Sequence, residues 1–438
     1  MIFFITLHIY ISHRCKGMKI IRTLIYSLYL LTLPIGAIAR TTVDGAIDKD
    51  SQRSDSIVAN YLKGTGIEIT DNNSVKLLMS GHDKFVDMFE CIRNAKSFVH
   101  LEYFNFRNDS IAGLLFNILT QKANEGVEVR ALYDDFGNWS NNQPIKKAQH
   151  DSINNLGVKL VKFDPLKFPY VNHIIPRDHR KIVVVDGKVA YTGGMNVADY
   201  YIEGIEGIGP WRDMHMRIEG PAVNELHRIF ATIWEDVTEE KIEGHKYFPQ
   251  HIGNKGNKRV AIVDRAPKVS NGSIRNLFAS MLDNAKHNVR IINPYFVPTH
   301  KVRKALKRAI DRGVNVEIML SAKSDIALTP DAAFYVANNL EKRGAKVYVF
   351  NGGFHHTKAM WVDDTFCTIG SSNMDSRSLR CDYEVNTVIF NRETIDELNC
   401  MFETDMENSD LLTRDYWKKR STWKKFTSWF GNLLTPVL

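Results

Sequence analysis

Hydrophobic residues along the chain follow two alternating periodicities. Segments such as Asp83–Lys96 and Lys301–Arg312 carry apolar residues at spacings of three and four, which predicts amphipathic helices. Short runs rich in β-branched residues lie between such segments and predict buried strands. Because strands alternate with helices, the pattern indicates an α/β fold with a mostly parallel sheet that helices cover on both faces. We expect the order helix, strand, helix, strand, helix, strand and then a hairpin.

This order of elements is expected twice, because short sequences recur in the two halves of the chain. Asn94-Ala95-Lys96 returns as Asn284-Ala285-Lys286, and the offset is 284 − 94 = 190. Gly126-Val-Glu-Val129 returns as Gly313-Val-Asn-Val316, with an offset of 313 − 126 = 187. A later repeat has an offset of only 177, so the first half has ten additional residues around Phe163–Arg177. We expect these residues to form a loop over the site.

The length of 438 residues exceeds one ordinary hydrophobic core, so two domains fit the chain. Polar stretches rich in Ser, Asp, Gly or Lys bracket the repeats and predict linkers. The predicted organisation is a signal peptide or membrane anchor at 1–39, a polar linker at 40–70, a first domain at 71–242, a linker at 243–258, and a second domain at 259–438 that ends in a basic, aromatic tail.

The apolar N-terminal segment has two interpretations. Residues Ile20–Ala39 form about 30 Å of helix, which spans a bilayer. The apolar run Thr23–Ile38 within it follows Lys19 and Arg22 and leads into the small-x-small triplet Ala37-Ile38-Ala39, as in secretory signals. Cleavage and anchoring remain alternatives, as do Met1 and Met18 for the start.

The main chemical signal is a motif that occurs twice. His179-Arg-Lys181, Asp186 and Gly193-Gly194-Met195-Asn196 return as His356-Thr-Lys358, Asp363 and Gly370-Ser371-Ser372-Asn373. The four differences 356 − 179, 358 − 181, 363 − 186 and 373 − 196 all equal 177. Two copies of a His/Lys/Asn set indicate a single site between similar halves, where two histidines divide the roles of nucleophile and acid.

Each copy of the motif is expected to be a β-hairpin. Asp186-Gly187 is a strong signal for a two-residue turn, and folding back around it places Gly194 opposite His179. The same construction places Ser371 opposite His356. Alternation along a strand puts His and Lys on one face and Asp on the other. We therefore assign the aspartates to holding the hairpin, and the His, Lys and Asn side chains to the chemistry.

The doubled HxKxxxxD pattern with its trailing Gly-Gly/Ser-x-Asn resembles the phospholipase D superfamily. Further stretches are similar to bacterial cardiolipin synthases: Tyr103-Phe104, Gly126-Val-Glu-Val-Arg130 with Asp134, Trp211-Arg212-Asp213, Asn373-Met-Asp-Ser-Arg377-Ser378, Glu384-Val-Asn386 and the ending Leu433-Leu434-Thr-Pro436-Val-Leu438. The resemblance implies two homologous phospholipase D-like domains, each a mostly parallel or mixed sheet flanked by helices, packed with pseudo-twofold symmetry around one active site.

The residues fit attack on a phosphodiester, which requires a nucleophile, a proton donor for the leaving alkoxide and positive charge for the phosphoryl oxygens. One histidine would form a phosphohistidine while the other moves the proton. The family favours the first of the two as nucleophile, whereas the sequence alone leaves this open. The resemblance also implies that acidic residues downstream orient the rings. The candidate set is His179, Lys181, Asp186, His356, Lys358 and Asp363 as catalytic motif residues, with Asn196, Asn373, Asp213 and Glu384 binding phosphate or supporting it, and no metal or cofactor is expected.

The resemblance implies that two phosphatidylglycerols give cardiolipin and glycerol at a bacterial cell membrane, with anionic phospholipid as partner and no nucleic acid. The formal charge of +7 fits an anionic partner but is too small to distinguish phospholipid from nucleic acid. Hydrolysis by a phospholipase D, and a nuclease, are the alternatives. Residues 417–430 interleave basic and aromatic side chains, which fits either an interfacial helix or a helix that docks its aromatics on the second domain.

Overall fold

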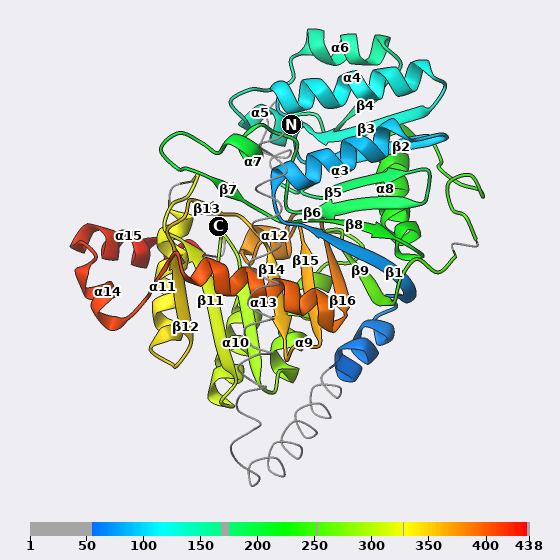
Figure 1. The fold of residues 1–438 in the computed structure, drawn as a ribbon. Helices are drawn as coiled ribbons and strands as arrows, with labels where there is room; N and C mark the ends of the chain where they lie inside the picture. Colours follow the sequence, from blue (N-terminus) through cyan, green and yellow to red (C-terminus); the bar gives the residue numbers. More distant parts are fainter. Residues whose placement is uncertain (1–54, 168–174, 251–252, 327, 436–438) are drawn as a thin grey trace, which may run out of the picture.

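The computed structural model describes residues 55–167, 175–250, 253–326 and 328–435. These residues form one continuous sheet of 15 strands (Figure 1). In spatial order the strands of the first half are β4 (Lys159–Phe163), β3 (Glu128–Asp134), β2 (Phe98–Tyr103), β5 (Lys181–Val185), β6 (Val189–Gly193), β8 (His215–Glu219) and β1 (Ile69–Leu78). The second half continues with β9 (Lys258–Arg265), β16 (Glu384–Phe390), β15 (Phe366–Gly370), β14 (Ala359–Val362), β10 (Asn288–Ile292), β11 (Asn315–Ser321), β12 (Lys346–Phe350) and β17 (Ser409–Leu411).

The two halves repeat one topology and meet where β1 pairs with β9 in antiparallel orientation. Each half contains three parallel strands, β2–β4 and β10–β12, and the hairpin and the strands beside the junction are antiparallel; the second half adds β17 antiparallel to β12 at its outer edge. The expected α/β class with two similar halves is therefore confirmed. Their sheets are mixed and join into one, because β1 and β9 supply each other's missing edge partner.

Helices cover both faces of this sheet, and apolar clusters fill the space between the layers. One face carries α3 (Gly81–Arg93), α4 (Ser110–Asn124), α6 (Lys147–Asn155), α9 (Ser273–Asn284), α10 (His300–Asp311) and α11 (Thr329–Glu341). The other carries α8 (Ala222–Thr238) and α13 (Arg392–Met406). Shorter elements lie in the loops and the tail: α5 (Asp135–Ser140), α7 (Tyr200–Glu203), β7 (Trp211–Arg212), β13 (Phe354–His355), α12 (Ser376–Arg380), α14 (Arg414–Lys419) and α15 (Thr422–Leu433).

The local sequences account for these layers. All five residues of β5 are buried, as expected for a Val-rich strand that helices cover on both faces. In α8 the buried residues Val223, Leu226, Phe230 and Ile233 recur at spacings of three and four, so one stripe of the helix faces the core. Each such side chain contributes about 1.5–3 kcal/mol on burial. This packing fixes the strands whose ends carry the motif residues.

Some of the chain differs from the expected organisation or lies outside the described residues. Residues 55–64, within the stretch expected to be a polar linker, form a helix that buries Val58 and Leu62 in the core of the second half. The apolar segment at 1–39 and the middle of the additional loop, at 168–174, lie outside the described residues. Within the described ranges, no helix combines the length and the apolar character needed to cross a bilayer.

The two motif hairpins form as predicted, but their register differs. β5 and β6 close around a three-residue turn at Asp186–Lys188, and β14 and β15 close around Asp363–Thr365. The first two residues of each turn have positive φ, as in a type I′ turn, and a third residue precedes the point where the ladder resumes. The expected facing of Gly194 and Ser371 to the two histidines is therefore wrong by one position.

Candidate active site

The site lies at the edge of the sheet where the parallel strands of both halves end, and short backbone pairings join the halves there. The N–H of His179 donates to the carbonyl of Tyr383 at 3.0 Å, and the N–H of Tyr383 donates to the carbonyl of Arg177 at 2.8 Å. In the second copy, β13 runs parallel to β7, and the N–H of His356 donates to the carbonyl of Arg212 at 2.6 Å. Each histidine is thus held by a segment of the opposite half.

The residue that follows each of these segments is a carboxylate directed at the histidine. Nδ1 of His179 lies 3.1 and 3.2 Å from the two oxygens of Glu384, and Nδ1 of His356 lies 2.6 Å from Oδ2 of Asp213. Both carboxylates are fully buried, whereas the side chains of His179 and His356 are 17% and 9% exposed. Because Nδ1 is occupied in both rings, Nε2 is the nitrogen left for chemistry. The expected roles of Asp213 and Glu384 agree with this geometry.

Gly194 and Ser371, at corresponding positions in the two copies of the motif, lie against the two carboxylates. A Cβ on Gly194 would lie 2.3 Å from Oδ1 of Asp213, so this position has no room for a side chain. The hydroxyl of the corresponding residue, Ser371, donates to Glu384 and also accepts the N–H of Val385 at 3.0 Å. Gly194 and Ser371 therefore help to position the two carboxylates.

The two lysines of the motif are buried beside the histidines. Nζ of Lys181 donates to the carbonyl of His179, and Nζ of Lys358 donates to the carbonyl of His356, both at 2.6 Å. Nζ of Lys358 also lies 2.8 Å from Nδ1 and 3.1 Å from Nε2 of His356. Each lysine is therefore fixed at the backbone of its histidine, and Lys358 also lies beside the imidazole ring.

Asn196 and Asn373 occupy loops that other side chains hold firmly. The buried Lys84 of α3 donates to the carbonyls of Met195 and Asn196 at 3.0 and 2.9 Å. Among the described residues, Oδ1 of Asn196 and Oδ1 of Asn373 are buried without a hydrogen-bond partner. Each of these oxygens accepts only and calls for a donor, such as a substrate hydroxyl, whereas the Nδ2 group of each residue is the atom that can donate to a phosphoryl oxygen.

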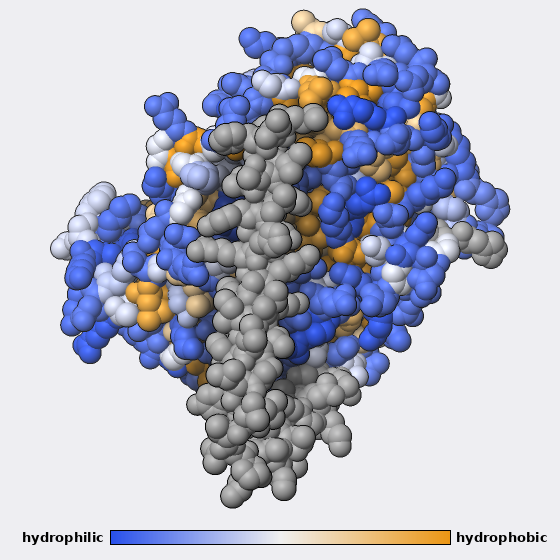
Figure 2. All heavy atoms as spheres, in the orientation of Figure 1, coloured by the Kyte–Doolittle hydropathy of each residue, from blue (hydrophilic) through white to orange (hydrophobic). Residues whose placement is uncertain are grey.

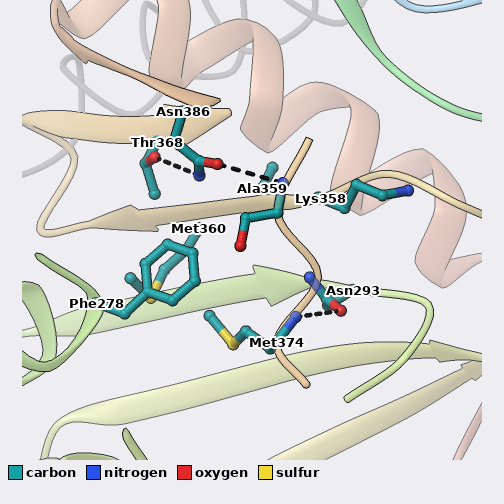
Figure 3. A pocket seen from close by; sticks show the side chains of 9 residues that line it. Phe278, Asn293, Lys358, Ala359, Met360, Thr368, Met374 and Asn386 are labelled. Atoms are coloured by element: carbon teal, nitrogen blue, oxygen red, sulfur yellow. Dashed lines mark hydrogen bonds between the residues drawn. The ribbon is translucent and has the colours of Figure 1, made fainter. Parts of the chain in front are cut away.

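The packing behind the second loop is visible in Figure 3. Asn386 donates to Thr368 and accepts from the N–H of Ser372, while Asn293 accepts the N–H of Met374 at 3.0 Å. Lys358 extends away from this pocket. The pocket is therefore the support of the loop, and the chemistry lies on the far side of Lys358.

The two aspartates of the motif lie at the opposite end of the hairpins. The carboxylate of Asp186 accepts the backbone N–H groups of Lys96, Ser97 and Phe98 at 2.8–3.0 Å. Asp363 accepts the corresponding N–H groups of residues 286–288 at 2.7–3.0 Å. Each aspartate ties its turn to the start of the neighbouring strand, so neither contacts the reacting groups.

Burial sets the charges of the site. It lowers the pKa of His179, with Lys181 adding to the effect and Glu384 opposing it. Burial and Lys358 lower the pKa of His356 to about 4, although Asp213 raises it. Both histidines are consequently neutral at neutral pH in the free site.

The lysines and carboxylates respond to the same burial. Burial lowers the pKa of Lys181 to about 7 and also lowers that of Lys358. Burial alone would raise the pKa of Glu384 and Asp213, but the histidines and lysines outweigh it, so both pKa values fall. An arriving phosphodiester anion would favour the charged forms of His and Lys.

The supporting contacts of three residues were not predicted from the sequence. Arg177 is buried and donates from Nε to both oxygens of Asp134, which fixes the segment before His179. Lys84 and Ser371 act on the loops and on a carboxylate, as described above. The burial of Lys84 could have been predicted, since it lies on the apolar face of its helix, four residues before Met88. The sequence gives no comparable signal for Arg177.

This arrangement can transfer a phosphoryl group between two oxygens. It has two imidazoles that can present free Nε2 atoms, carboxylates that fix both rings, and buried cations beside them. One continuous sheet, within an α/β fold, carries the whole set in two copies. Fold and site together define an enzyme of the phospholipase D superfamily, of the kind that has both motifs in one chain.

Comparison with known proteins identifies the family within that class. The family model described as "Cardiolipin synthase, PLD-like domain" matches residues 88–234 and 278–406. Cardiolipin synthase 1 of Staphylococcus epidermidis is 35% identical over 374 residues, which are 84% of this chain and 75% of that protein. The probable cardiolipin synthase YwiE of Bacillus subtilis is 35% identical over 86% of this chain and 75% of its own length. The chain belongs to this family.

The fold has a counterpart among solved structures. The crystal structure of phosphatidylserine synthase from Haemophilus influenzae superimposes with a TM-score of 0.67 at 13% identity, covering 89% of this chain and 100% of that one. At this identity the similarity concerns the fold alone.

Proposed function

We propose that this enzyme transfers a phosphatidyl group through a phosphohistidine intermediate, and that it makes cardiolipin and glycerol from two molecules of phosphatidylglycerol. The observation that carries the proposal is the crosswise pairing of His179 with Glu384 and of His356 with Asp213 in one site. The relatives named cardiolipin synthase support the choice of lipid. The proposed location is the bacterial cell membrane, where this substrate resides.

The reaction has two balanced steps. Nε2 of one histidine attacks phosphorus of the first phosphatidylglycerol, forming a P–N bond as the P–O bond to glycerol breaks, and the other histidine protonates the departing oxygen. A hydroxyl of the second phosphatidylglycerol then gives its proton to that second histidine and attacks phosphorus, and the P–N bond breaks. The two phosphodiester bonds are alike, so the exchange needs no nucleotide.

The lysines and asparagines stabilise the charge on phosphorus oxygens in both steps. Lys358 lies 3.1 Å from Nε2 of His356, so an oxygen bound to this lysine would lie near that nitrogen. The Nδ2 groups of Asn196 and Asn373 would donate to oxygens of the same phosphate. The site thus supplies positive charge without a metal ion.

Two observations bear on which histidine attacks. The family resemblance favours His179 as nucleophile and His356 as acid. The pKa of about 4 at His356 favours the reverse, because a nucleophile must be neutral. We propose His179 as nucleophile, with His356 gaining its proton when the anionic substrate is bound.

The test is to incubate the purified full chain with phosphatidylglycerol alone and to analyse the lipids by mass spectrometry. Cardiolipin and equimolar glycerol are expected. Phosphatidic acid as the sole product would refute the synthase and indicate a phospholipase D. Salt-sensitive cleavage of DNA, without a lipid product, would indicate a nuclease.

A further inference from the structure

The C-terminal helix α15 rests on α11 through a face of small and polar residues. Ser428 and Gly431 are its buried residues, and a Cβ on Gly431 would approach Ala332 and the carbonyl of Leu328 to 3.2 Å. The hydroxyl of Thr427 donates to Asp331 of α11 at 2.9 Å. Small side chains and hydrogen bonds, and not the aromatic residues, therefore hold this helix in place.

Anchoring extends to α14 and its connection to α15. The guanidinium of Arg420 donates to Asp331 at 3.0 Å and lies 4.2 Å from the ring centre of Phe334. Arg303 of α10 donates to Asn432 at 3.1 Å. The orientation of α15 is thus fixed by contacts at several points along its length.

The opposite face of α15 carries large apolar side chains that solvent reaches. Trp423, Phe426, Phe430 and Leu433 recur at spacings of three, four and three, which places them on one side of the helix, and Trp429 flanks them. They are 42–69% exposed. The ring of Phe426 lies 5.7–6.2 Å from those of its three aromatic neighbours, so the exposed side chains form one cluster. The alternative that the tail docks its aromatics on the second domain is wrong for this cluster.

Positive charge surrounds the cluster. Residues 411–438 contain six Lys and Arg and one Asp, a formal charge of 6 − 1 = +5 out of +7 for the whole chain. Lys418 and Lys419 are exposed, and Lys425 is half-buried at the border of the apolar face. At the left of Figure 2, where Figure 1 places α14 and α15, hydrophilic residues lie beside residues of intermediate hydropathy. Exposed aromatics within a basic rim fit the boundary of an anionic bilayer.

This surface lies on the side of the molecule that holds the active site. Helix α11 begins after the loop that leaves the carboxyl end of β11, and α15 covers the start of α11. In that loop Asp325 accepts the hydroxyl of Tyr295 at 2.6 Å, and the ring of Tyr295 lies 5.9 Å from that of His356. A bilayer in contact with α15 would therefore lie at the same end of the parallel strands as the reacting histidines.

We propose that the exposed face of α15, with the lysines of α14 and α15, seats the catalytic region on an anionic phospholipid bilayer so that lipid headgroups reach the site. This inference rests on the proposed lipid substrate. The occupant is a bilayer and not a second copy of the chain, since two surfaces of the same positive charge would repel each other.

The test compares two double variants of the full chain. Phe426→Ser with Leu433→Ser removes two side chains of the cluster, which are 49% and 53% exposed. Val86→Ser with Leu156→Ser is the matched control, with exposures of 55% and 50% on α3 and after α6. Cardiolipin formation is measured on vesicles of phosphatidylglycerol and, separately, on short-chain phosphatidylglycerol below its micellar concentration.

The variant of α15 is expected to lose about tenfold or more of its rate on vesicles and to keep the wild-type rate on monomeric lipid. The control pair should match the wild type on both. Equal rates of the α15 variant and the wild type on vesicles would overturn the proposal. So would a wild-type dimer in detergent that the variant converts to a monomer, since the face would then be an interface between copies.

A second measurement separates this inference from the proposed function. If the wild type makes no cardiolipin from either form of the lipid, the proposed function fails. Quenching of tryptophan fluorescence by vesicles of brominated phosphatidylglycerol, compared between the wild type and Trp423→Phe, then still tests the docking surface. Less quenching in the variant supports it, and unchanged quenching overturns it.

Discussion

Replacing the carboxylate beside each histidine tests the crosswise site directly. Glu384→Gln and Asp213→Asn keep the size of each side chain and remove its charge. In the wild type these carboxylates lie 3.1 Å and 2.6 Å from Nδ1 of His179 and His356. Each variant changes one half of the chain and is expected to impair the histidine of the other.

The magnitude follows from the bonds removed. A hydrogen bond to a charged group contributes about 1.5–3 kcal/mol, and each 1.4 kcal/mol is a factor of ten. Both carboxylates are fully buried, so solvent does not screen this contribution. We therefore expect kcat to fall about tenfold to a hundredfold in each variant. Far-ultraviolet circular dichroism should show an unchanged fold.

The assay is the pH dependence of kcat/KM for cardiolipin formation. A carboxylate favours the imidazolium form, so its removal lowers the pKa of the histidine that it contacts. The nucleophile must be neutral, and a lower pKa moves the acid limb of the profile to lower pH. The acid must be protonated, so a lower pKa moves the alkaline limb to lower pH. With His179 as nucleophile, Glu384→Gln shifts the acid limb and Asp213→Asn shifts the alkaline limb.

The opposite pattern of limbs would exchange the roles of the histidines and leave the crosswise site intact. A different result would refute the reasoning itself. If either variant kept more than half of the wild-type kcat with both limbs in place, that carboxylate would not be orienting its histidine.

Further predictions concern single positions. His179→Ala should lose at least about a thousandfold in kcat and form no phosphatidyl adduct, which acid-quenched peptide mapping would detect in the wild type; an adduct in the variant would contradict the assignment. Ser371→Ala removes one neutral hydroxyl from Glu384 and should lower kcat about fivefold, as a lost bond of about 1 kcal/mol implies, and a loss beyond a hundredfold would show a direct role. Asp186→Asn should lower the free energy of unfolding by about 1.5–3 kcal/mol in urea and leave the rate per folded molecule near that of the wild type; a large loss of kcat in stable protein would contradict its structural role. Dialysis against EDTA should leave cardiolipin formation unchanged, and restoration of a lost rate by a divalent ion would refute catalysis without a metal.

Much of the fold was predictable because the sequence repeats itself. Strands with buried β-branched residues and helices with apolar stripes have strong local signals, and the repeat showed that the order occurs twice. The junction was not predictable in this way, since β1 and β9 belong to different halves of the chain and their pairing leaves no local signal in either sequence. No local pattern indicates that two sheets will share an edge.

The chemistry of the site was also largely readable from the sequence, whereas its fine geometry was not. Residue types and spacing identified the His, Lys and Asn sets, and strand parity separated the aspartates from them. The predicted register was wrong by one residue because each turn contains one residue more than the two-residue turn that Asp-Gly indicates. Arg177 escaped prediction because its partner, Asp134, is 43 residues away and its burial depends on tertiary packing.

The pairing of each histidine with the other half has a consequence for how such a site diversifies. In a symmetric dimer of single-motif chains, any change beside one histidine would appear beside both. Here the copies have separated: Ser371 and Glu384 stand beside His179, where the matching positions beside His356 are Gly194 and Asp213. A duplicated site within one polypeptide can therefore give its two imidazoles different surroundings, one suited to forming a bond with phosphorus and the other to carrying a proton.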